Sequence, residues 1–254
     1  MNSIPFFDNH YPVRTLCSSS ADWQDFSNWQ HPDTRNAMLE DYLHIPLKQV
    51  FYARETHSGN VLVVDDEHSG SLAMTEEAGI LGPAGGQDAL VTATPCILLC
   101  IWTADCLPLF LYDTEGHVAA IAHCGWRSIC NGIVSGTVDV MVGRFHANPG
   151  DIVAAFGPGI CASCYEVRSD LIEAFSKRFP ADEIGEFFVA ARNGEYHLDL
   201  RKAVAFELAR MGVLPENLFD TEICSYETEG YSSYRRDGGS EPSKQTLSGI
   251  VLAS

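Results

Sequence analysis

The sequence predicts a mixed α+β fold. Apolar runs of strand length dominate the chain up to about Ala122, whereas apolar residues at helical spacing follow in later stretches. Strands and helices thus come in separate runs instead of alternating strictly, which favours mixed β-sheets over a doubly wound parallel sheet. The chain has 254 residues, of which 46% are hydrophobic and 20% charged, so it can bury a full core. We therefore expect a single domain over residues 1–254.

The first half of the chain supplies most of the strand candidates. Residues 1–48 form a polar N-terminal segment with three aromatic residues that we expect to pack over the core: Trp23, Phe26 and Trp29. Residues 61–64 form an apolar strand. Leu107–Asp113 and His117–Ala122 are apolar runs on either side of the sequence DTEG, whose composition is typical of a turn. These two runs predict a hairpin.

The second half supplies three helix candidates, each with apolar residues three or four positions apart. They cover residues 129–145, 171–179 and 200–211. Ser128 stands where the first helix needs an N-cap, and Gly212 follows the last helix. Two further apolar runs predict strands, at residues 151–156 and 246–252.

The composition limits which classes of partner and which cellular compartment we expect. A net charge of −18 argues against nucleic acid or an anionic membrane as a partner. No segment has the pattern of a signal peptide or the length of a membrane span, so we expect a cytoplasmic protein. In that compartment the nine cysteines are expected to be buried or metal-binding thiols. Cys161 and Cys164 have redox spacing, but they lie in a Gly-Pro loop, and we interpret them as inert thiols.

Two reactive side chains lie where the predicted hairpin begins and ends. Cys106 precedes its first strand and His123 follows its second, so both come out at the same end. A thiolate beside an imidazole can hold zinc, or the two can act as nucleophile and base. His57 would complete a set of three zinc ligands with an open fourth position. Spacing alone does not bring these three residues together, and a buried thiol with two surface histidines is the alternative.

The residues next to these side chains suggest anion binding. Arg127 follows a glycine turn at the expected start of a helix, where free backbone N–H groups attract anions and a guanidinium adds a bidentate clamp. The alternative is that Arg127 forms an ion pair with a carboxylate and only stabilises the turn. Asp105 precedes Cys106, and strand alternation directs its side chain to the opposite face.

Six segments follow one another in a set order: ETHSGN (55–60), TADC (103–106), HCGWR (123–127), FGPGICASCYEV (156–167), YHLDLRKA (196–203) and YSSYRRDGG (231–239). Together they resemble the YfiH/laccase-domain family, from about Gln49 to the C-terminus. The resemblance implies two packed mixed sheets with helices outside, similar to the deamidase domain of cytotoxic necrotizing factor. It also implies that His57, Cys106 and His123 bind zinc.

The activity implied by the resemblance is that of a zinc-dependent purine nucleoside enzyme. Members carry out phosphorolysis of adenosine, inosine, guanosine and methylthioadenosine, and deamination of adenosine. The expected partners are therefore a purine nucleoside and phosphate, bound by a monomer. We expect Cys106, Asp105 and Arg127 to take part in catalysis, although Asp105 can equally have a structural role. In a chain of net charge −18 a phosphate needs a local basic cluster, and Arg235-Arg236 is the dense one, so we expect these two arginines to bind substrate. Glu166 lies in a segment that resembles the family's Tyr-Glu-Val, which implies a place in the substrate pocket. Deamination needs a carboxylate to move a proton, for which Asp105 and Glu55 are the candidates.

The chain departs from the family pattern at several positions. Glu55 and Ser58 replace a Gln and a Gly around the first His, and Gln87-Asp88-Ala89 replaces an Ala-Asp-Ala segment. A C-terminal Gly-Arg is missing, with Lys244-Gln245 at roughly that place. If the family Arg grips phosphate, its loss weakens the case for phosphorolysis more than the case for a metal.

Three other functions stay open at this point. Cys106 and His123 without metal would resemble the Cys–His pair of the toxin deamidase and make a cysteine hydrolase. Related bacterial members are linked to peptidoglycan-precursor editing. A copper polyphenol oxidase is the third, although the chain has no His-x-His pair. Copper binds His and Cys ligands more tightly than zinc does, so it can occupy such a site in vitro.

Overall fold

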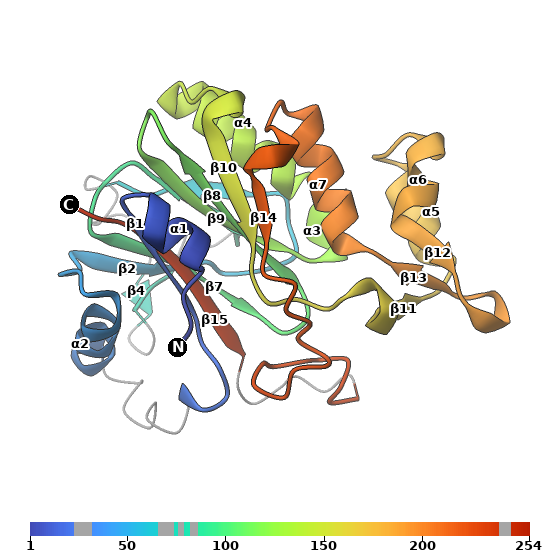
Figure 1. Ribbon diagram of the computed structural model, residues 1–254, viewed down its shortest axis with the longest axis horizontal. Coiled ribbons are helices and arrows are strands. Elements are labelled where there is room, and N and C mark those ends of the chain that lie inside the picture. Colours follow the sequence, from blue (N-terminus) through green and yellow to red (C-terminus); the bar gives the residue numbers. More distant parts are fainter. Residues whose placement is uncertain (23–31, 66–73, 76–78, 82–85, 239–244) are drawn as a thin grey trace.

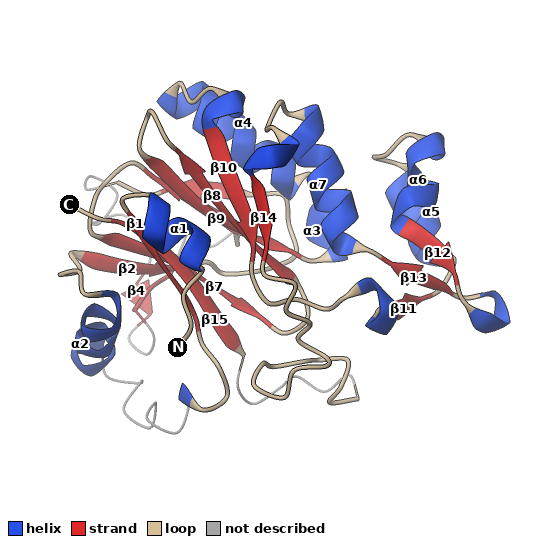
Figure 2. Ribbon diagram, in the orientation of Figure 1, coloured by secondary structure: helices blue, strands red, loops and turns tan. Residues whose placement is uncertain are grey.

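The computed structural model describes residues 1–22, 32–65, 74–75, 79–81, 86–238 and 245–254 (Figure 1). These residues form three β-sheets with helices outside them, an α+β fold as predicted (Figure 2). The predicted packing of Trp23, Phe26 and Trp29 falls outside the described residues. Among the described residues, no helix combines the length and the apolar character needed to cross a membrane.

The first sheet contains six strands and is mixed. Its central strand, β7, is almost wholly apolar and pairs antiparallel with β15 and parallel with β2. The order across the sheet is β1 (Val13–Cys17), β15 (Thr246–Leu252), β7 (Ile97–Thr103), β2 (Gln49–Tyr52), β5 (Gly79–Leu81) and β4 (Met74–Thr75).

The second sheet also contains six strands, and the predicted hairpin lies at its centre. β8 and β9 pair antiparallel with Pro108 opposite His123, and all seven residues of each strand are buried. The order is β14 (Leu218–Asp220), β10 (Ile152–Phe156), β8 (Leu107–Asp113), β9 (Val118–Cys124), β6 (Ala89–Thr92) and β3 (Val61–Val63).

The core lies between and around these two sheets. Phe51 and Leu99 of the first sheet pack against Phe110 and Ile121 of the second in one buried cluster. On the other face of the second sheet lie α3 (Trp126–Cys130), α4 (Ile133–Phe145) and α7 (Leu200–Arg210) (Figure 1). Helix α2 (Pro32–Leu43) covers the outer face of the first sheet. Helix α1 (Pro5–His10) packs beside β1, buries Phe7 in the cluster between the sheets and stacks Phe6 on Phe219 of β14.

A small third sheet stands at one end of the molecule (Figure 1). Its strands are β11 (Glu166–Val167), β13 (Tyr196–Leu198) and β12 (Phe188–Ala190). The helices α5 (Asp170–Ser176) and α6 (Ala181–Phe187) pack beside it, with Phe175 of α5 edge to face with Phe188 of β12. Phe179, between the two helices, contacts both Phe175 and Phe187.

The structure corrects three details of the prediction. The helix expected over residues 129–145 is two helices, α3 and α4, because Gly132 takes a left-handed conformation with φ of +85° between them. Gly125, and not Ser128, is the N-cap residue of α3, and the side chain of Ser128 is buried inside that helix. The strand predicted to end at Ala122 continues to Cys124, so His123 lies within β9.

Candidate active site

The structure brings together the three side chains that the sequence singled out. One ring nitrogen each of His57 and His123 and the sulfur of Cys106 all lie within 4.8 Å of one another, and we call this group the His–Cys cluster. Cys106 lies in the loop between β7 and β8, His123 in β9, and His57 in the loop after β2. The two imidazole rings meet edge to face, with centroids 5.0 Å apart and planes at 74°.

A carboxylate that the sequence analysis did not single out as functional, Asp88, holds the cluster together. Its Oδ1 accepts a hydrogen bond from Nδ1 of His123 at 2.8 Å, and its carboxylate also accepts from the backbone N–H groups of His57 at 3.0 Å and Ser58 at 2.6 Å. The Asp88 side chain is fully buried. Since Nδ1 of His123 donates to Asp88, Nε2 is the nitrogen left to bind a metal or, when protonated, to donate to Cys106.

The hydrogen bonds to Asp88 also decide its charge. Burial alone would raise the pKa of this carboxyl, but the hydrogen bonds from His123 and Ser58 outweigh burial and lower the pKa to about 2. The group is therefore ionised at neutral pH. A buried carboxylate behind a histidine ligand fixes the ring orientation and makes the ring a better ligand.

The thiol of Cys106 is prepared for ionisation in the same way. Burial opposes the thiolate, but His123 beside it and hydrogen bonds from His123 and His57 lower the pKa of Cys106 to about 6. Gly125 allows the close approach of these groups. A Cβ on Gly125 would lie 2.8 Å from Sγ of Cys106 and 3.1 Å from Cδ2 of His57. The glycine therefore leaves room that any other side chain would fill.

The donor set fits a transition metal. Two imidazoles and a thiolate, all within 4.8 Å, are ligands that zinc and copper accept readily. Three protein ligands also leave one tetrahedral position open, as catalytic zinc sites require. His57 and Cys106 line a cavity, so the cluster is accessible from it.

This cavity has a volume of about 460 Å³ and combines aromatic, charged and amide groups. Its aromatic walls are Trp126, Tyr165 and Tyr234. The other lining residues are His57, Ala104, Asp105, Cys106, Arg127, Ile160, Leu200, Arg235 and Gln245.

Two predicted anion ligands, Arg127 and Arg235, line this cavity. The Arg127 guanidinium lies 4.3 Å from the Trp126 ring centroid and forms no ion pair with a described residue. The Arg235 guanidinium lies 5.1 Å from the Tyr165 ring centroid and donates to the Glu166 carbonyl at 2.8 Å. Both guanidiniums therefore lie on aromatic faces of the cavity.

Asp105 also lines the cavity, which corrects the expectation that its side chain leaves on the opposite face from Cys106. The reason is that Asp105 lies between β7 and β8, in a left-handed conformation with φ of +83°, where strand alternation does not apply. Its carboxylate accepts hydrogen bonds from the Ser225 hydroxyl at 2.7 Å and the Arg235 backbone N–H at 2.6 Å. Asp105 thereby holds the segment that carries Arg235.

Two predicted substrate-binding residues, Glu166 and Arg236, do not line the cavity. The guanidinium of Arg236 donates to the backbone carbonyls of Ser225, Tyr226 and Tyr231, so it organises its own loop. The side chain of Glu166 is exposed on β11. The role of these two residues in substrate binding stays a prediction.

Glu55, the replacement for the family Gln, lies close behind the cluster. Its Oε1 accepts a hydrogen bond from the Trp102 backbone N–H at 2.7 Å. Burial raises the pKa of this carboxyl to about 7, although the nearby His123 acts in the opposite direction. Glu55 can therefore hold or release a proton near neutral pH.

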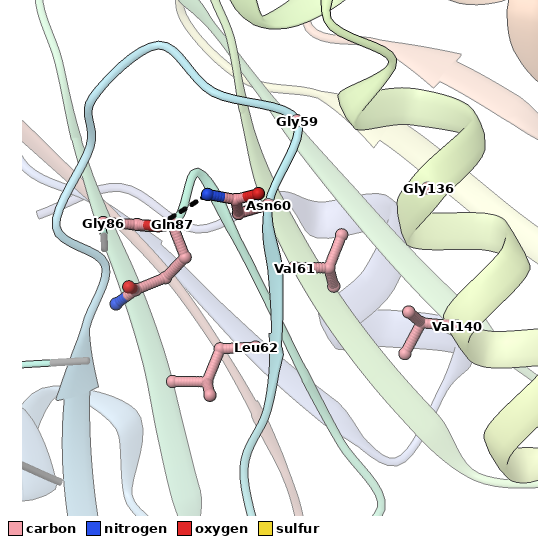
Figure 3. A pocket seen from close by; sticks show the side chains of 8 residues that line it. All are labelled: Gly59, Asn60, Val61, Leu62, Gly86, Gln87, Gly136 and Val140. Atoms are coloured by element: carbon pink, nitrogen blue, oxygen red, sulfur yellow. Dashed lines mark hydrogen bonds between the residues drawn. The ribbon is translucent and has the colours of Figure 1, made fainter. Parts of the chain in front are cut away.

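A second cavity, of about 510 Å³, lies beside the segment that follows His57 (Figure 3). Its described lining residues come from this segment, from residues 86–87 and from α4: Gly59, Asn60, Val61, Leu62, Gly86, Gln87, Gly136 and Val140. None of these described residues is ionisable, so the chemistry belongs to the cavity that contains Cys106.

The fold and the site together define an α+β protein with a His–Cys metal-ligand cluster at the wall of a polar and aromatic cavity. A family model described as multi-copper polyphenol oxidoreductase laccase matches residues 29–251. The chain belongs to this family, the one that the sequence segments resemble under the name YfiH/laccase domain.

Relatives with enzyme names share much of the chain. An adenosine deaminase named RL5, from an unknown prokaryotic organism, is 36% identical over 213 residues, which cover 82% of this chain and 77% of that protein. A purine nucleoside phosphorylase from Deinococcus radiodurans is 46% identical over 152 residues, which cover 60% of this chain and 56% of that protein.

Solved structures give the same result for the fold. The crystal structure of the hypothetical protein YfiH from Bacillus licheniformis matches with a TM-score of 0.76 at 29% identity, and covers 88% of this chain and 81% of that one. The crystal structure of YlmD from Geobacillus stearothermophilus matches with a TM-score of 0.74 at 26% identity, and covers 86% and 79%.

Proposed function

We propose that this protein is a zinc-dependent purine nucleoside enzyme that carries out phosphorolysis of adenosine, inosine, guanosine and methylthioadenosine and deamination of adenosine. The observation that carries the proposal is the meeting of His57, Cys106 and His123 at a cavity with aromatic walls and two arginines. Relatives named purine nucleoside phosphorylase and adenosine deaminase support the same substrate class. A cytoplasmic monomer remains part of the proposal.

The cavity wall supplies groups for each part of the substrate. Trp126, Tyr165 and Tyr234 offer aromatic faces against which a purine ring can stack. Arg127 and Arg235 offer guanidinium groups that bind phosphate through two parallel hydrogen bonds each. The same cavity therefore offers aromatic faces for a purine base and cations for phosphate.

The residues of the His–Cys cluster would hold the metal. Zinc bound there supplies a Lewis acid that polarises a substrate oxygen and activates water for attack on the amine-bearing ring carbon. Asp88 keeps the His123 ring oriented with Nε2 toward the cluster. Gly125 keeps the space beside Cys106 open.

Besides Asp88, which holds His123, two acidic side chains near the cluster are candidates for proton transfer. Asp105 already accepts two hydrogen bonds, from the Ser225 hydroxyl and the Arg235 N–H, so we assign it to positioning Arg235 beside the reacting groups. Glu55 has a pKa raised to about 7, which suits a group that must gain and lose a proton near neutral pH. We therefore propose Glu55 as the proton-carrying group in deamination.

The missing Gly-Arg of the family bears on phosphorolysis. Gln245 lines the cavity near that place and offers a neutral amide. Arg127 and Arg235 are then the cations that must neutralise phosphate in this chain. Phosphorolysis is accordingly the activity most sensitive to their removal.

One observation favours a second candidate function, a metal-free cysteine hydrolase. Cys106, His123 and Asp88 form a row in which the thiol pKa is lowered to about 6 and the imidazole is held by a carboxylate. Such a row can act as nucleophile, base and orienting group. The likeness to the toxin deamidase domain stays a prediction.

Nucleoside assays with and without phosphate test the proposal. We expect release of free base only with phosphate, and inosine formation from adenosine without it. Arg127→Gln should raise the KM for phosphate about tenfold, because one charge-assisted bidentate contact is lost, and should leave deamination nearly unchanged. Arg144→Gln, on the exposed end of α4, is the matched control and should change neither.

Two results would separate the candidates. Loss of both activities on metal removal, with recovery on addition of zinc, supports the zinc enzyme. Full activity of metal-free protein that is abolished by alkylation of Cys106 would contradict it and support the cysteine hydrolase.

A further inference from the structure

Three cysteines and a glutamate form a second cluster, which shares no residue with the His–Cys cluster. The sulfur atoms of Cys161, Cys164 and Cys224 and one carboxylate oxygen of Glu227 lie within 4.8 Å of one another. We call this group the three-cysteine cluster. Cys224 is buried, Cys161 and Cys164 are half-buried, and Glu227 is exposed.

Two chain segments meet to form this cluster. Cys161 and Cys164 bracket a short 3-10 turn, in which the Cys164 N–H donates to the Cys161 carbonyl at 3.1 Å. Cys224 reaches the same place because it forms a parallel bridge with Gly159. The Cys161 N–H then donates to Sγ of Cys224 at 3.3 Å. The backbone, and not the thiols alone, therefore sets the arrangement.

Hydrogen bonds hold the two more exposed thiols in place. Sγ of Cys164 lies 3.4 Å from Oε1 of Glu227, and Sγ of Cys161 lies 3.2 Å from the Ser163 hydroxyl. In a tetrahedral zinc site, Zn–S bonds of about 2.3 Å place the donor atoms about 3.8 Å apart. Donors already within 4.8 Å need to move by about 1 Å or less to bind one ion.

We propose that Cys161, Cys164, Cys224 and Glu227 bind a second zinc ion, in a structural site distinct from the His–Cys cluster. Four protein donors complete a tetrahedron and leave no open position, which is the pattern of structural and not catalytic zinc. Three thiolates and a carboxylate at this range repel one another, and a divalent cation offsets that repulsion. A disulfide would use two of the thiols and leave the third thiol and Glu227 without a function.

The site would stabilise one wall of the cavity. The segment with Cys161 and Cys164 also carries Ile160 and Tyr165, and the segment with Cys224 leads to Tyr234, all of which line the cavity or its rim. Arg201 already ties these segments by donating to the carbonyls of Ile160 at 3.2 Å and Ile223 at 2.9 Å. A metal would add a second tie next to the first.

Metal content per chain of the purified full-length protein, measured by mass spectrometry, tests the proposal. We expect two zinc equivalents in the wild type, one in Cys164→Ser, one in Cys106→Ala and none in the double variant. Cys130→Ser is the matched control, since Cys130 is also half-buried but belongs to neither cluster, and it should keep two. The Cys106→Ala arm reports on the His–Cys cluster separately, so failure of one site is distinguishable from failure of the other.

A second pair of variants keeps the test decisive if Cys164→Ser does not fold. Glu227 is exposed, so Glu227→Ala should fold and should lose the second equivalent in the presence of a competing chelator. In a Cys106→Ala background, where the His–Cys cluster supplies no thiolate, it should also weaken the thiolate-to-metal absorption of the cobalt-loaded protein. Glu227→His supplies another accepted zinc ligand and should restore both. One zinc in the wild type that Cys106→Ala removes completely would overturn the proposal, as would the mass of a disulfide among the three cysteines.

Discussion

The His–Cys cluster and the three-cysteine cluster present similar donor atoms on different supports. In the His–Cys cluster, Cys106 lies between β7 and β8, His123 lies in β9 and His57 lies in the loop after β2. The carboxylate of Asp88 accepts hydrogen bonds from His123 and from the backbone of His57. The three-cysteine cluster is built from two loops and hydrogen bonds to itself. The first cluster thus rests on buried strands and a buried carboxylate, and two of its residues line the cavity, whereas none of the four residues of the second cluster does.

The number of donors separates the two clusters chemically. The His–Cys cluster offers three donors beside a cavity, whereas the three-cysteine cluster offers four. Zinc bound at the first cluster would therefore keep a position for substrate, and zinc bound at the second would not. The comparison predicts that changes behind the first cluster abolish chemistry, while changes in the second reduce stability.

The largest effect is expected from Asp88→Ala. This variant leaves Nδ1 of His123 and the backbone N–H groups of His57 and Ser58 without their buried acceptor. We expect a loss of about 3–5 kcal/mol in the free energy of unfolding and loss of the metal from the His–Cys cluster. Denaturant unfolding and metal analysis measure the two effects.

Asp113→Ala is the matched control for this prediction. Asp113 is also a buried carboxylate of the second sheet, but it accepts from the Glu115 N–H at the turn end of β8. It should lose stability while it keeps the metal. Equal metal content in the Asp88 and Asp113 variants would show that Asp88 does not support the cluster.

Gly125→Ala is expected to have the second largest effect. Gly125 has φ of −78°, which alanine adopts without backbone strain. The substitution therefore acts only through the steric clash of the added Cβ with its neighbours. Its Cβ would meet Sγ of Cys106 at 2.8 Å and displace it from the two histidines. We expect at least a tenfold loss of metal affinity in a protein that still folds.

Gly143→Ala provides the comparison for Gly125. Gly143 lies inside α4, where a Cβ would meet nothing within 4 Å, so alanine should stabilise the helix by about 1 kcal/mol and leave the metal in place. Chelator competition followed by mass spectrometry compares the two variants. Unchanged affinity in Gly125→Ala would contradict the close packing of the cluster.

The sequence pattern predicted that Cys106 and His123 meet, and the family resemblance added His57, whereas neither indicated the three-cysteine cluster. The hairpin of β8 and β9 is signalled by two apolar runs around a turn, so the common end of Cys106 and His123 follows from local pattern. Cys161 and Cys164 meet Cys224 only through a bridge between segments about 60 residues apart. Their interpretation as inert thiols rested on local spacing alone, which carries no information about such a bridge.

The supporting residues show the same limit. Asp88 precedes a strand and its sequence neighbours do not reveal which groups its carboxylate accepts from. The arginines near the C-terminus also show that sequence neighbours do not reveal which groups a side chain binds. Arg235 and Arg236 are adjacent in sequence, yet Arg235 lines the cavity and Arg236 binds backbone carbonyls of its own loop. Side-chain direction in a loop without regular structure cannot be read from sequence periodicity.

A smaller effect is expected from Glu55→Gln. The folded protein raises the pKa of Glu55 from 4.5 to about 7, so the contribution of this carboxyl to stability is present below pH 4.5 and is lost as the pH rises toward 7. Gln keeps an acceptor for the Trp102 N–H without a titrating group. Relative to the wild type, the variant should therefore gain on the order of 1–3 kcal/mol between pH 5 and pH 8.

Denaturant unfolding at the two pH values measures this gain. Deamination should fall in the same variant if Glu55 carries the proton, while metal content stays at the wild-type value. A stability difference that is the same at both pH values would contradict the raised pKa. Unchanged deamination would remove Glu55 from the proposed mechanism and return the role to Asp105.

The smallest expected effect is a difference in alkylation rate between Cys106 and Cys130 in metal-free protein. The pKa of Cys106 is lowered to about 6, whereas burial raises that of Cys130 to about 11. Alkylation of Cys106 by iodoacetamide should reach half its maximal rate near pH 6, because only the thiolate reacts. At pH 7 its advantage over an ordinary thiol is only a few-fold, since a thiolate of low pKa is a weaker nucleophile. Peptide mass spectrometry after timed alkylation follows both cysteines in one sample, with Cys130 as the unreactive internal reference.

Asp88→Asn should move the midpoint for Cys106 upward, because His123 then loses the carboxylate that favours its charged form beside the thiolate. A midpoint near 8.5 for Cys106 in the wild type would mean that the histidines do not stabilise its thiolate, and would leave the metal as the only source of its ionisation.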